Sequence, residues 1–375
     1  MTFVLFYHSL LSDWNHGNAH FLRGVVSELL DRGHAVSVYE PEDGWSLEHL
    51  REEHGEGPVE ELLDVYPQLR GISRFYDLET LDLDRALDGA DAVLVHEWSH
   101  PDLVARIGRH RQSGGAYRLL FHDTHHRAIT KPEEMERYDL SGYDGALAFG
   151  EVLRQIYLER GWAGRAWTWH EAADARLFRP LEREREGDLV WIGNWGDDER
   201  SAELLEFLVE PSERLGLRTR IHGVRYPVLA RWALRRVGID YAGWVPNHWA
   251  PDVFARFGVT VHVPRRPYVE ALPGIPTIRP FEALACGIPL VCSPWDDAEG
   301  LFTPDEDYLV ARDGAEMERH LRDVLHDPDL AAGLAAHGRR TIEARHTCAH
   351  RVDELLAVLA ELGVAPAAAG APTTA

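Results

Sequence analysis

Residues 279–292, RPFEALACGIPLVC, place a single carboxylate at the start of a very short helix. Pro280 suits the first helical position, because its fixed φ and missing N–H carry no penalty there, and Gly287 is a typical C-terminal stop. Glu282 then lies in the first turn. A carboxylate there can simply complement the helix dipole. Alternatively, it can accept hydrogen bonds from two ribose hydroxyls, while the exposed N–H groups of residues 275–282 hold a diphosphate.

The segment of residues 122–127, HDTHHR, is a second candidate for chemistry because it follows an apolar stretch at 117–121. Four of its side chains titrate or bind metals: His122, Asp123, His125 and His126. Such loop spacing is weak evidence for a metal site. A histidine that packs at a strand end is the more common outcome. A third interpretation, a catalytic histidine, depends on the resemblance described below.

Two further segments carry polar groups at the ends of expected strands. His96, Glu97 and Trp98 could contact an acceptor molecule or could cap and pack. The turn at residues 193–196, GNWG, could bring backbone N–H groups close to phosphate. It is not the G-x-G-x-x-G dinucleotide fingerprint, which disfavours a dehydrogenase. A leaving diphosphate needs positive charge, which three arginines could supply: Arg200, Arg279 and either Arg265 or Arg266.

The elements that position these groups alternate between strands and helices. Apolar strands are expected at residues 3–7, 35–39, 92–95, 117–121 and 145–149, and again at 188–193, 218–222, 258–263 and 288–292. Helical spacing of apolar residues separates them, for example at residues 21–30 and 199–215. This alternation predicts parallel sheets covered on both faces. Residues 45–80 are charged and are interpreted as a partly helical insertion that packs on the first domain.

The length of 375 residues favours two domains. The charged, proline-containing stretch at 179–187 suits a linker between them. Ligands of doubly wound sheets bind outside the carboxyl ends of the strands, which is where the candidate residues lie. We therefore expect a domain over residues 1–180, a second over 181–345, and a C-terminal helix at 346–365 that could pack back toward the first domain. We expect the tail at 366–375 to be disordered.

Composition excludes several classes of function. The net charge of -23 opposes general binding to nucleic acid or to anionic lipid. Three cysteines argue against a disulfide framework and against a zinc cage, and they fit a cytoplasmic protein. No apolar run is long enough for a membrane helix, and residues 1–7 do not resemble a signal peptide. One local exception is the basic segment 225–236, RYPVLARWALRR, which could form a helix that touches a membrane or polymer, although a solvated helix face is the simpler interpretation.

The segment FEALACGIPLV at residues 281–291 resembles the donor domain of GT-B glycosyltransferases of the family 4, or group 1, kind. A second match supports the first. Residues 170–180, HEAADARLFRP, resemble the N-G-V-D-x-x-x-F-x-P segment at the domain junction of that family, with Asp174, Phe178 and Pro180 at its key positions. The resemblance extends to further segments, whose style is most similar to the CgeB-like branch: residues 17–34, 188–200, 241–264 and 297–314.

The resemblance implies a GT-B fold, in which two doubly wound Rossmann-like domains face a central cleft. It implies an acceptor-side N-terminal domain, a C-terminal domain that binds the nucleotide sugar, no need for a divalent metal, and retention at the anomeric carbon. It also implies that a histidine at a strand end contacts the donor sugar near its reacting carbon. His122 matches that histidine best, and His125 is the runner-up.

The sequence departs from the family pattern in two places. The family often has two glutamates spaced E-x7-E, but the position that precedes Glu282 at this spacing is Gly274. Glu270 could substitute if the loop is longer here. The lysine usual near the entrance of the donor domain is also absent, and Arg200 is the nearest cation.

We therefore expect a glycosyltransferase, hexosyltransferase-like, that moves a sugar from a nucleoside-diphosphate sugar to a hydroxyl on a small molecule or glycan. It would need no cofactor or metal and no nucleic acid, and its membrane contact would be peripheral at most. The expected catalytic residues are His122, Asp123 and His125. The expected donor-binding residues are Gly193, Asn194, Arg200, Arg225, Arg265, Arg279, Pro280, Phe281, Glu282 and Glu299. The expected acceptor-binding residues are Asn15, Gly17, Asn18, His96, Glu97 and Trp98.

Two alternatives remain open from the sequence. One is an isomerase like the nucleotide-sugar 2-epimerases, which share this architecture, need acid and base carboxylates and use no acceptor. The other is a non-catalytic protein that binds nucleotide or carbohydrate. The missing first glutamate keeps this second alternative open.

Overall fold

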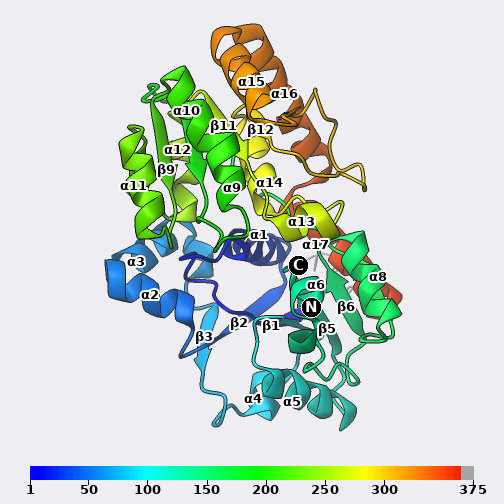
Figure 1. Cartoon of the computed structure of the whole chain (residues 1–375). Coiled ribbons are helices and arrows are strands. Elements are labelled where there is room, and N and C mark those ends of the chain that lie inside the picture. The colour runs from blue at the N-terminus through cyan, green and yellow to red at the C-terminus, as the bar shows by residue number, and fades with distance from the viewer. Residues whose placement is uncertain (365–375) are drawn as a thin grey trace, which may run out of the picture. The chain divides into compact units, whose positions relative to one another are not determined.

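The computed structural model describes residues 1–364, which form two α/β units (Figure 1). Unit 1 consists of Met1–Ser12, Leu22–His170 and Ala349–Ala375, of which the last eleven residues lie outside the described part. Unit 2 consists of Asp13–Phe21 and Glu171–Cys348. Each unit contains its own parallel sheet, as the alternation of strands and helices predicts.

The sheet of unit 1 has seven parallel strands in the order β3-β2-β1-β4-β5-β6-β7. Its strands are β1 (Thr2–Phe6), β2 (Ala35–Pro41), β3 (Ser73–Tyr76), β4 (Ala92–His96), β5 (Arg118–Asp123), β6 (Gly145–Ala148) and β7 (Ala166–Thr168). The central strands are buried along their whole length, because helices cover both faces of a doubly wound sheet. The helices are α1 (Asn18–Asp31), α2 (Trp45–His54), α3 (Gly57–Val65), η1 (Pro67–Leu69), α4 (Leu83–Ala86), α5 (Pro101–Gln112), α6 (Arg127–Thr130), α7 (Pro132–Met135), α8 (Glu151–Glu159) and α17 (Cys348–Glu361).

The sheet of unit 2 has six parallel strands in the order β10-β9-β8-β11-β12-β13. Its strands are β8 (Leu189–Ile192), β9 (Thr219–His222), β10 (Asp240–Gly243), β11 (Val259–His262), β12 (Leu290–Cys292) and β13 (Leu309–Val310). The helices are α9 (Ser201–Leu204), the π-helical turn η2 (Leu205–Val209), α10 (Glu210–Leu215), α11 (Val228–Arg236), η3 (Asn247–Trp249), α12 (Ala250–Ala255), α13 (Arg266–Ala271), α14 (Ile278–Cys286), α15 (Gly314–His326) and α16 (Pro328–Arg345).

The short helix that carries Glu282 forms as predicted, with one difference at its start. Gly287 ends α14 in the left-handed conformation, with φ of 68°, which a residue without a side chain adopts most easily. Pro280, however, is the third residue of α14, which begins at Ile278. Proline is tolerated there because the first N–H groups of a helix have no intrahelical acceptor.

All nine predicted strands are present, but four others were missed. β3, β7, β10 and β13 lie at or next to a sheet edge, and they have two to four residues each. Half-exposed or very short strands lack the continuous apolar run that identifies a buried strand. The interpretation of residues 45–80 as an insertion was therefore incomplete, because β3 from this segment pairs with β2 and extends the sheet.

The division into units differs from the predicted boundaries at 180/181 and 345/346. Residues 171–178 belong to unit 2, where Ala173 bridges Thr347 and the backbone N–H of Asp174 donates to Nε2 of His20 at 2.8 Å. The same contact explains why Asp13–Phe21 groups with unit 2 rather than with the rest of the N-terminal segment. The 179–187 stretch lies inside unit 2.

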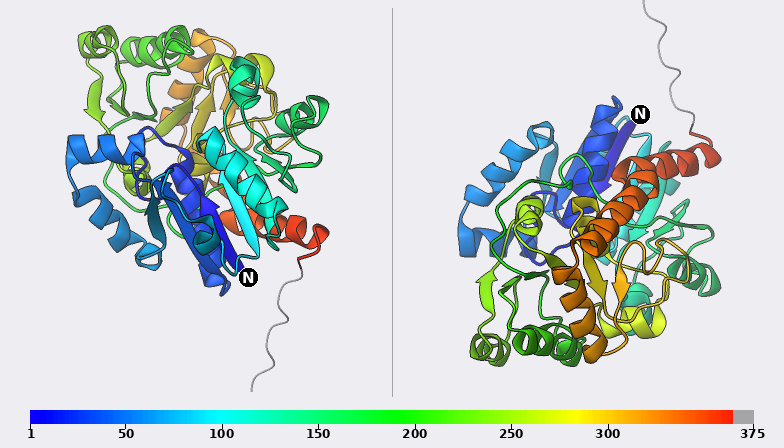
Figure 2. Two further views of the ribbon diagram at one scale, coloured as in Figure 1. Left: turned by 90° about the horizontal axis from the view of Figure 1, so that it is seen from below. Right: turned by 90° about the horizontal axis from the view of Figure 1, so that it is seen from above.

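Helix α17 belongs to unit 1. The indole N–H of Trp169 donates to the carbonyl of Arg351 at 2.8 Å, and Arg32 pairs with Asp353 at 2.5 Å. Figure 2 shows α17, in red, beside the elements of unit 1 that contain the N-terminus. The predicted tail at 366–375 lies outside the described residues.

Two further findings concern the chain as a whole. Cys286, Cys292 and Cys348 are buried and not bonded to one another. Within residues 1–364, no helix combines the length and the apolar character needed to cross a membrane.

Candidate active site

The carboxyl ends of the three neighbouring strands β1, β4 and β5 bring a buried ring cluster together in unit 1. His96 and His122 are register partners at the ends of β4 and β5, and the hydroxyl of Tyr7 lies 2.7 Å from Nδ1 of His122. The ring of Trp169 lies 4.7 Å from that of His122. Burial lowers the pKa of His122 to about 3, so its imidazole is neutral at physiological pH. Its side chain has no exposed surface and cannot contact a ligand unless this cluster opens.

His125 occupies a different position just beyond β5. Its ring is half-buried, packs edge-on against Trp98 at 5.3 Å, and lies 4.0 Å from the ring of His126. Its backbone N–H donates to Oδ1 of Asp123 at 3.0 Å, which anchors the loop. Trp98 itself is 36% exposed. His125 and Trp98 are thus the members of the predicted site in unit 1 that a ligand can reach directly.

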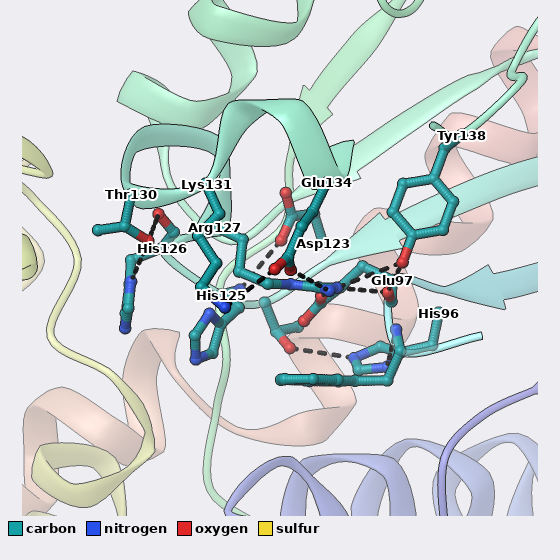
Figure 3. Close-up of polar contacts among 12 residues, drawn as sticks. His96, Glu97, Asp123, His125, His126, Arg127, Thr130, Lys131, Glu134 and Tyr138 are labelled. Carbon is teal, nitrogen blue, oxygen red and sulfur yellow. Dashed lines mark hydrogen bonds and ion pairs between the residues drawn. The ribbon is translucent and has the colours of Figure 1, made fainter. Parts of the chain in front are cut away.

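A network of charged and polar groups that includes Glu97, Arg127 and Tyr138 lies near His125 (Figure 3). Arg127 pairs with the carboxylate of Glu97 and places its guanidinium 4.3 Å from the ring of Trp98. The hydroxyl of Tyr138 donates to the carbonyl of Glu97. Burial and the neighbouring charge of Asp123 raise the pKa of Glu97, against the effect of Arg127. Glu97 is fully buried, so its part in this arrangement is to hold Arg127 and Trp98 in place.

Asp123 is also enclosed by protein groups. Its second oxygen accepts a hydrogen bond from the hydroxyl of Tyr157 at 2.8 Å, and burial raises its pKa. An aspartate held in this way orients the loop of His125 rather than meeting a substrate. Within the described part of the chain, no three histidine, cysteine, aspartate or glutamate side chains are grouped so that they could hold a metal ion.

In unit 2, three predicted arginines converge near the carboxyl ends of β8 and β11. Arg200 donates to the carbonyl of Val263 at 2.8 Å, and to the carbonyl and side-chain oxygen of Asn194 at 2.8 and 2.9 Å. Arg265 donates to the side-chain oxygen of Asn194 at 3.2 Å. Burial and the positive charges of Arg265 and Arg279 lower the pKa of Arg200 to about 10. Two of the three arginines also have carboxylate partners, since Arg265 pairs with Glu199 at 2.8 Å and Arg279 pairs with Glu282. The positive charge that remains would favour a nearby anion.

Two buried histidines at the same sheet edge were missed from the sequence. His262 ends β11, and burial together with Arg200 and Arg279 lowers its pKa to about 3. His222 ends β9, where burial lowers its pKa to about 4. Both are the last residues of strands that the sequence predicts, and that position is the signal that could have found them.

The turn at residues 193–196 offers less to a phosphate than predicted. The N–H of Gly193 donates to the carbonyl of His222 at 2.8 Å, and its carbonyl accepts from the hydroxyl of Tyr226 at 2.8 Å. Both backbone groups of Gly193 are therefore used within the protein. Asn194 remains close to the arginines, and its side-chain amide donates to Oδ1 of Asn15 at 2.7 Å.

Glu282 is fully buried on α14. Its Oε1 accepts from Asn247 at 2.7 Å and lies 2.8 Å from Nδ1 of His20, while its Oε2 pairs with Arg279. Burial alone would raise the pKa of Glu282, but the charge of Arg279 and the bonds from His20 and Asn247 outweigh it and lower the pKa. Ribose hydroxyls can reach this carboxylate only if one of these partners moves aside.

Other predicted residues are distributed differently. Pro280 and Phe281 are buried, and Phe281 packs in the core against Phe302 and His346, so neither is placed to contact a donor. The reason is that α14 is buried on all sides, since every residue of this helix except Arg279 is buried. Arg225 is exposed and pairs with Asp197 at 3.0 Å.

The three loop residues expected to bind an acceptor in the first domain lie in unit 2 instead. Asn15 contacts Asn194 as described, and the side chain of Asn18 donates to Glu171 at 3.3 Å. A Cβ on Gly17 would lie 3.3 Å from the side chain of Ile278, so this loop packs closely on the start of α14. Their location places them beside the donor-binding candidates.

Glu299 lies against Gly274, the position where the family pattern has its first glutamate. A Cβ on Gly274 would lie 2.8 Å from the carboxylate oxygen Oε1 of Glu299, and Gly274 has a φ of 86°. The Glu299 side chain therefore fills the space that a side chain at residue 274 would need. Glu270 is exposed on α13.

Residues 176–357 match a family model described as glycosyl transferase-like. Among solved structures, sucrose-phosphate synthase from Thermosynechococcus elongatus is similar with a TM-score of 0.64 and 14% identity, over 96% of this chain and 99% of that one. Alr3699/HepE from Anabaena, in complex with UDP and glucose, is similar with a TM-score of 0.64 and 12% identity, over 96% and 100% of the two chains.

A third similar structure is an alpha-glucosyltransferase in complex with UDP-glucose and DNA containing an abasic site. It has a TM-score of 0.65 and 10% identity, over 96% of this chain and 99% of that one. A search of curated proteins by sequence finds no match. At these identities the structural likeness establishes the fold. The chain therefore has the two-sheet GT-B fold of these structures, and its residues 176–357 match a glycosyl transferase-like family model.

Proposed function

We propose that this protein is a glycosyltransferase that moves a hexose from a nucleoside-diphosphate sugar, first of all a UDP-sugar, to a hydroxyl group, with retention at the anomeric carbon. The observation that carries the proposal is the cluster of Arg200, Arg265 and Arg279 within the part of the chain that matches the glycosyl transferase-like family. Two similar structures contain UDP or UDP-glucose, which makes uridine the first base to test.

The arginine cluster suits the chemistry of this reaction. When the bond from the sugar to the diphosphate breaks, negative charge develops on the leaving oxygen, and fixed positive charge nearby lowers the barrier. The cluster is assembled by hydrogen bonds to Asn194 and to the carbonyl of Val263, so its geometry exists before a ligand arrives. No metal ion is required for this role, because the guanidinium groups themselves neutralise the charge.

Glu299 is our candidate for contact with hydroxyls of the donor sugar. Its carboxylate occupies the space beside Gly274, and a half-buried carboxylate is a strong acceptor for sugar hydroxyls. This assignment would supply the group that the E-x7-E pattern lacks. We propose that Glu282 binds the ribose hydroxyls after the side chain of Asn247 or Arg279 moves away from its carboxylate.

His125 is our candidate for the catalytic histidine in unit 1, with Trp98 beside it as a stacking surface for an acceptor or sugar ring. Its partial exposure favours it over His122, which is fully enclosed. We propose a small molecule or glycan as the acceptor, because the net charge of -23 opposes nucleic acid. The sequence segments that resemble the family are most similar to its CgeB-like branch, and we propose that the protein is related to that branch.

The test compares two adjacent arginines. Both arginines pair with a carboxylate, Arg265 with Glu199 at 2.8 Å and Arg266 with Glu203 at 2.9 Å. They differ because Arg265 also donates to Asn194 and lowers the pKa of Arg200. A charged hydrogen bond contributes about 1.5–3 kcal/mol, so Arg265→Gln should weaken calorimetric binding of UDP roughly ten- to a hundred-fold. Arg266→Gln is the matched control and should bind UDP like the wild type.

Turnover is tested by the release of UDP from UDP-glucose in the presence of a panel of sugar and small-molecule acceptors. If Arg265→Gln and Arg266→Gln change the UDP affinity equally, the arginine cluster is not the site that binds the diphosphate. Formation of a sugar epimer without an acceptor would establish an isomerase instead. Binding of UDP with no turnover for any acceptor would favour the non-catalytic alternative.

A further inference from the structure

Helix α11 has an inner face that explains its position and an outer face that does not fit a solvated helix. Ala230 and Leu234, four residues apart, are buried in the core of unit 2. On the opposite side, Val228, Leu229 and Trp232 are 73%, 80% and 61% exposed. Residues 228 and 232 share one helix face because they are four apart.

This exposure is unusual within the chain. Among the large apolar side chains of residues 1–364, these three are the most exposed, and the next is Trp249 at 43%. Single exposed apolar residues are common on protein surfaces, but a contiguous group that includes tryptophan indicates an interaction site. The outer face of α11, defined by Val228, Leu229 and Trp232, therefore calls for a partner.

Positive charge surrounds this apolar face. Arg231, Arg235 and Arg236 are exposed on the same helix, which contains no acidic residue. None of the three forms an ion pair with a carboxylate anywhere in the described chain, although acidic residues outnumber basic ones by 62 to 39. The guanidinium of Arg236 lies 5.8 Å from the ring of Trp232, so charge and apolar surface belong to one patch.

We infer that the outer face of α11 binds the surface of an anionic lipid bilayer. Tryptophan and aliphatic side chains enter the boundary between headgroups and acyl chains, and arginines reach lipid phosphates from the same helix. Side chains that are 61–80% exposed project from the surface, as insertion into a bilayer requires. The site would take anionic phospholipid headgroups, independently of the nucleotide chemistry proposed above.

Two other occupants fit the patch less well. A second copy of the chain, joined through a two-fold axis, would bring the arginines of one α11 against those of the other, and their like charges would repel. A nucleic acid would meet the arginines, but the apolar side chains at the centre of the patch would have no apolar partner on a phosphate backbone.

The inference is tested by flotation of the full-length protein with vesicles of phosphatidylcholine alone, or of equal parts of phosphatidylcholine and phosphatidylglycerol. We expect the wild type to float with the anionic vesicles and to be released by high salt, because salt screens the arginines. Replacing Arg231, Arg235 and Arg236 together by glutamine should weaken partitioning roughly a hundredfold. The double variant Leu229→Ser/Trp232→Ser should also lose flotation.

Matched controls separate the patch from general changes in charge and apolarity. Replacing the exposed Arg322, Arg339 and Arg340 by glutamine makes the same change in net charge on α15 and α16. The double variant Leu205→Ser/Val269→Ser removes two partly exposed apolar residues from other elements. Both controls should float like the wild type.

The inference is overturned if the wild type does not float with anionic vesicles, or if the α11 variants float as well as the wild type. It is also overturned if the control variants lose as much flotation as the α11 variants. Sedimentation velocity adds a further arm. A wild-type dimer that the Leu229→Ser/Trp232→Ser variant abolishes, without lipid binding, would show that the face joins two copies of the chain. Thermal unfolding of each variant verifies that the fold persists.

Discussion

Replacing Glu282 by glutamine should destabilise unit 2 by about 3 kcal/mol. From the sequence, a carboxylate in a first helical turn contributes only about 0.3–1 kcal/mol through the helix dipole. The contacts of Glu282 in the structure indicate a larger contribution to stability. Oε1 of Glu282 serves both Asn247 and His20, and glutamine can keep these two bonds because it retains one oxygen. Oε2 serves Arg279, and there glutamine presents an N–H₂ group to another donor.

The magnitude follows from this single lost partner. Breaking a buried ion pair costs about 3–5 kcal/mol, and a charged hydrogen bond contributes about 1.5–3 kcal/mol. Arg279 retains 17% exposure of its side chain, so water compensates in part, and a value near 3 kcal/mol is expected. Glu282 and Arg279 are partners in one ion pair. The losses of stability caused by Glu282→Gln and by Arg279→Gln should therefore not be additive. The double variant should lose clearly less than the sum of the two single losses.

The assay is urea-induced unfolding followed by circular dichroism, with Glu213→Gln as the control. Glu213 is exposed on α10 in the same unit, and its replacement should change stability by less than about 0.5 kcal/mol. The folded pKa of Glu282 is lowered, so its contribution is complete above the unfolded value of about 4.3 and is lost as pH falls through the folded value. Additive losses, or a difference from wild type that stays constant down to acidic pH, would refute the reasoning.

Two further predictions follow from burial. Burial, with a contribution from Glu282, raises the pKa of Glu171 to about 8, so ionisation at rising pH opposes folding. Glu171→Gln should raise the melting temperature relative to wild type, by a margin that widens between about pH 5 and pH 8, and a constant margin would contradict this. His125→Ala should lower transferase turnover at least tenfold with UDP affinity within about twofold, while His122→Ala should mainly lower the melting temperature by opening a cavity beside Tyr7 and Trp169. Lost turnover in a stable His122→Ala, with normal turnover in His125→Ala, would return the catalytic role to His122.

The parts of the fold that the sequence predicts are those with strong local signals. Buried parallel strands such as β4 are continuous apolar runs, and α14 ends at Gly287 because glycine adopts the left-handed conformation easily. The edge strands β3, β10 and β13 lack such a run, because an edge strand buries only part of its surface. Their pairing depends on neighbours distant in the sequence, which one segment read alone does not reveal.

The candidate site shows the same limit at the level of side chains. Position at a strand end identified His122 as a candidate, because polar residues after buried strands gather at one sheet edge. The start of a short helix identified Glu282, and the need for positive charge near a diphosphate identified Arg200. Burial could not be predicted in the same way. His122 is enclosed by Tyr7 and Trp169, which precede and follow it by 115 and 47 residues. The number of enclosing side chains, rather than strand position, separates His122 from His125.

The division into units differs from the predicted domain boundary for a related reason. His20 links the loop at residues 13–21 to unit 2 through both ring nitrogens, since Nδ1 faces Glu282 and Nε2 accepts from the backbone of Asp174. This arrangement fits the tautomer that carries its proton on Nδ1. Asp174 is part of the junction segment that the sequence identified, but its partner lies 154 residues earlier in the chain. Charge and proline content at residues 179–187 gave no information on this contact.

The space around Gly274 shows how a departure from a motif can leave chemistry intact. A family pattern specifies the residue type at a sequence position. A ligand, however, interacts with whichever atoms line its binding site, and these can come from another residue. At Gly274 the backbone has a φ of 86°, which strains any residue with a side chain, and the carboxylate of Glu299 lies where that side chain would begin. The two features support each other, since glycine removes the obstacle that would exclude Glu299. The absence of glutamate at residue 274 is therefore weak evidence against a transferase. Under this reasoning, Glu299→Gln should impair turnover of a donor sugar more than binding of UDP, and equal losses in both would contradict it.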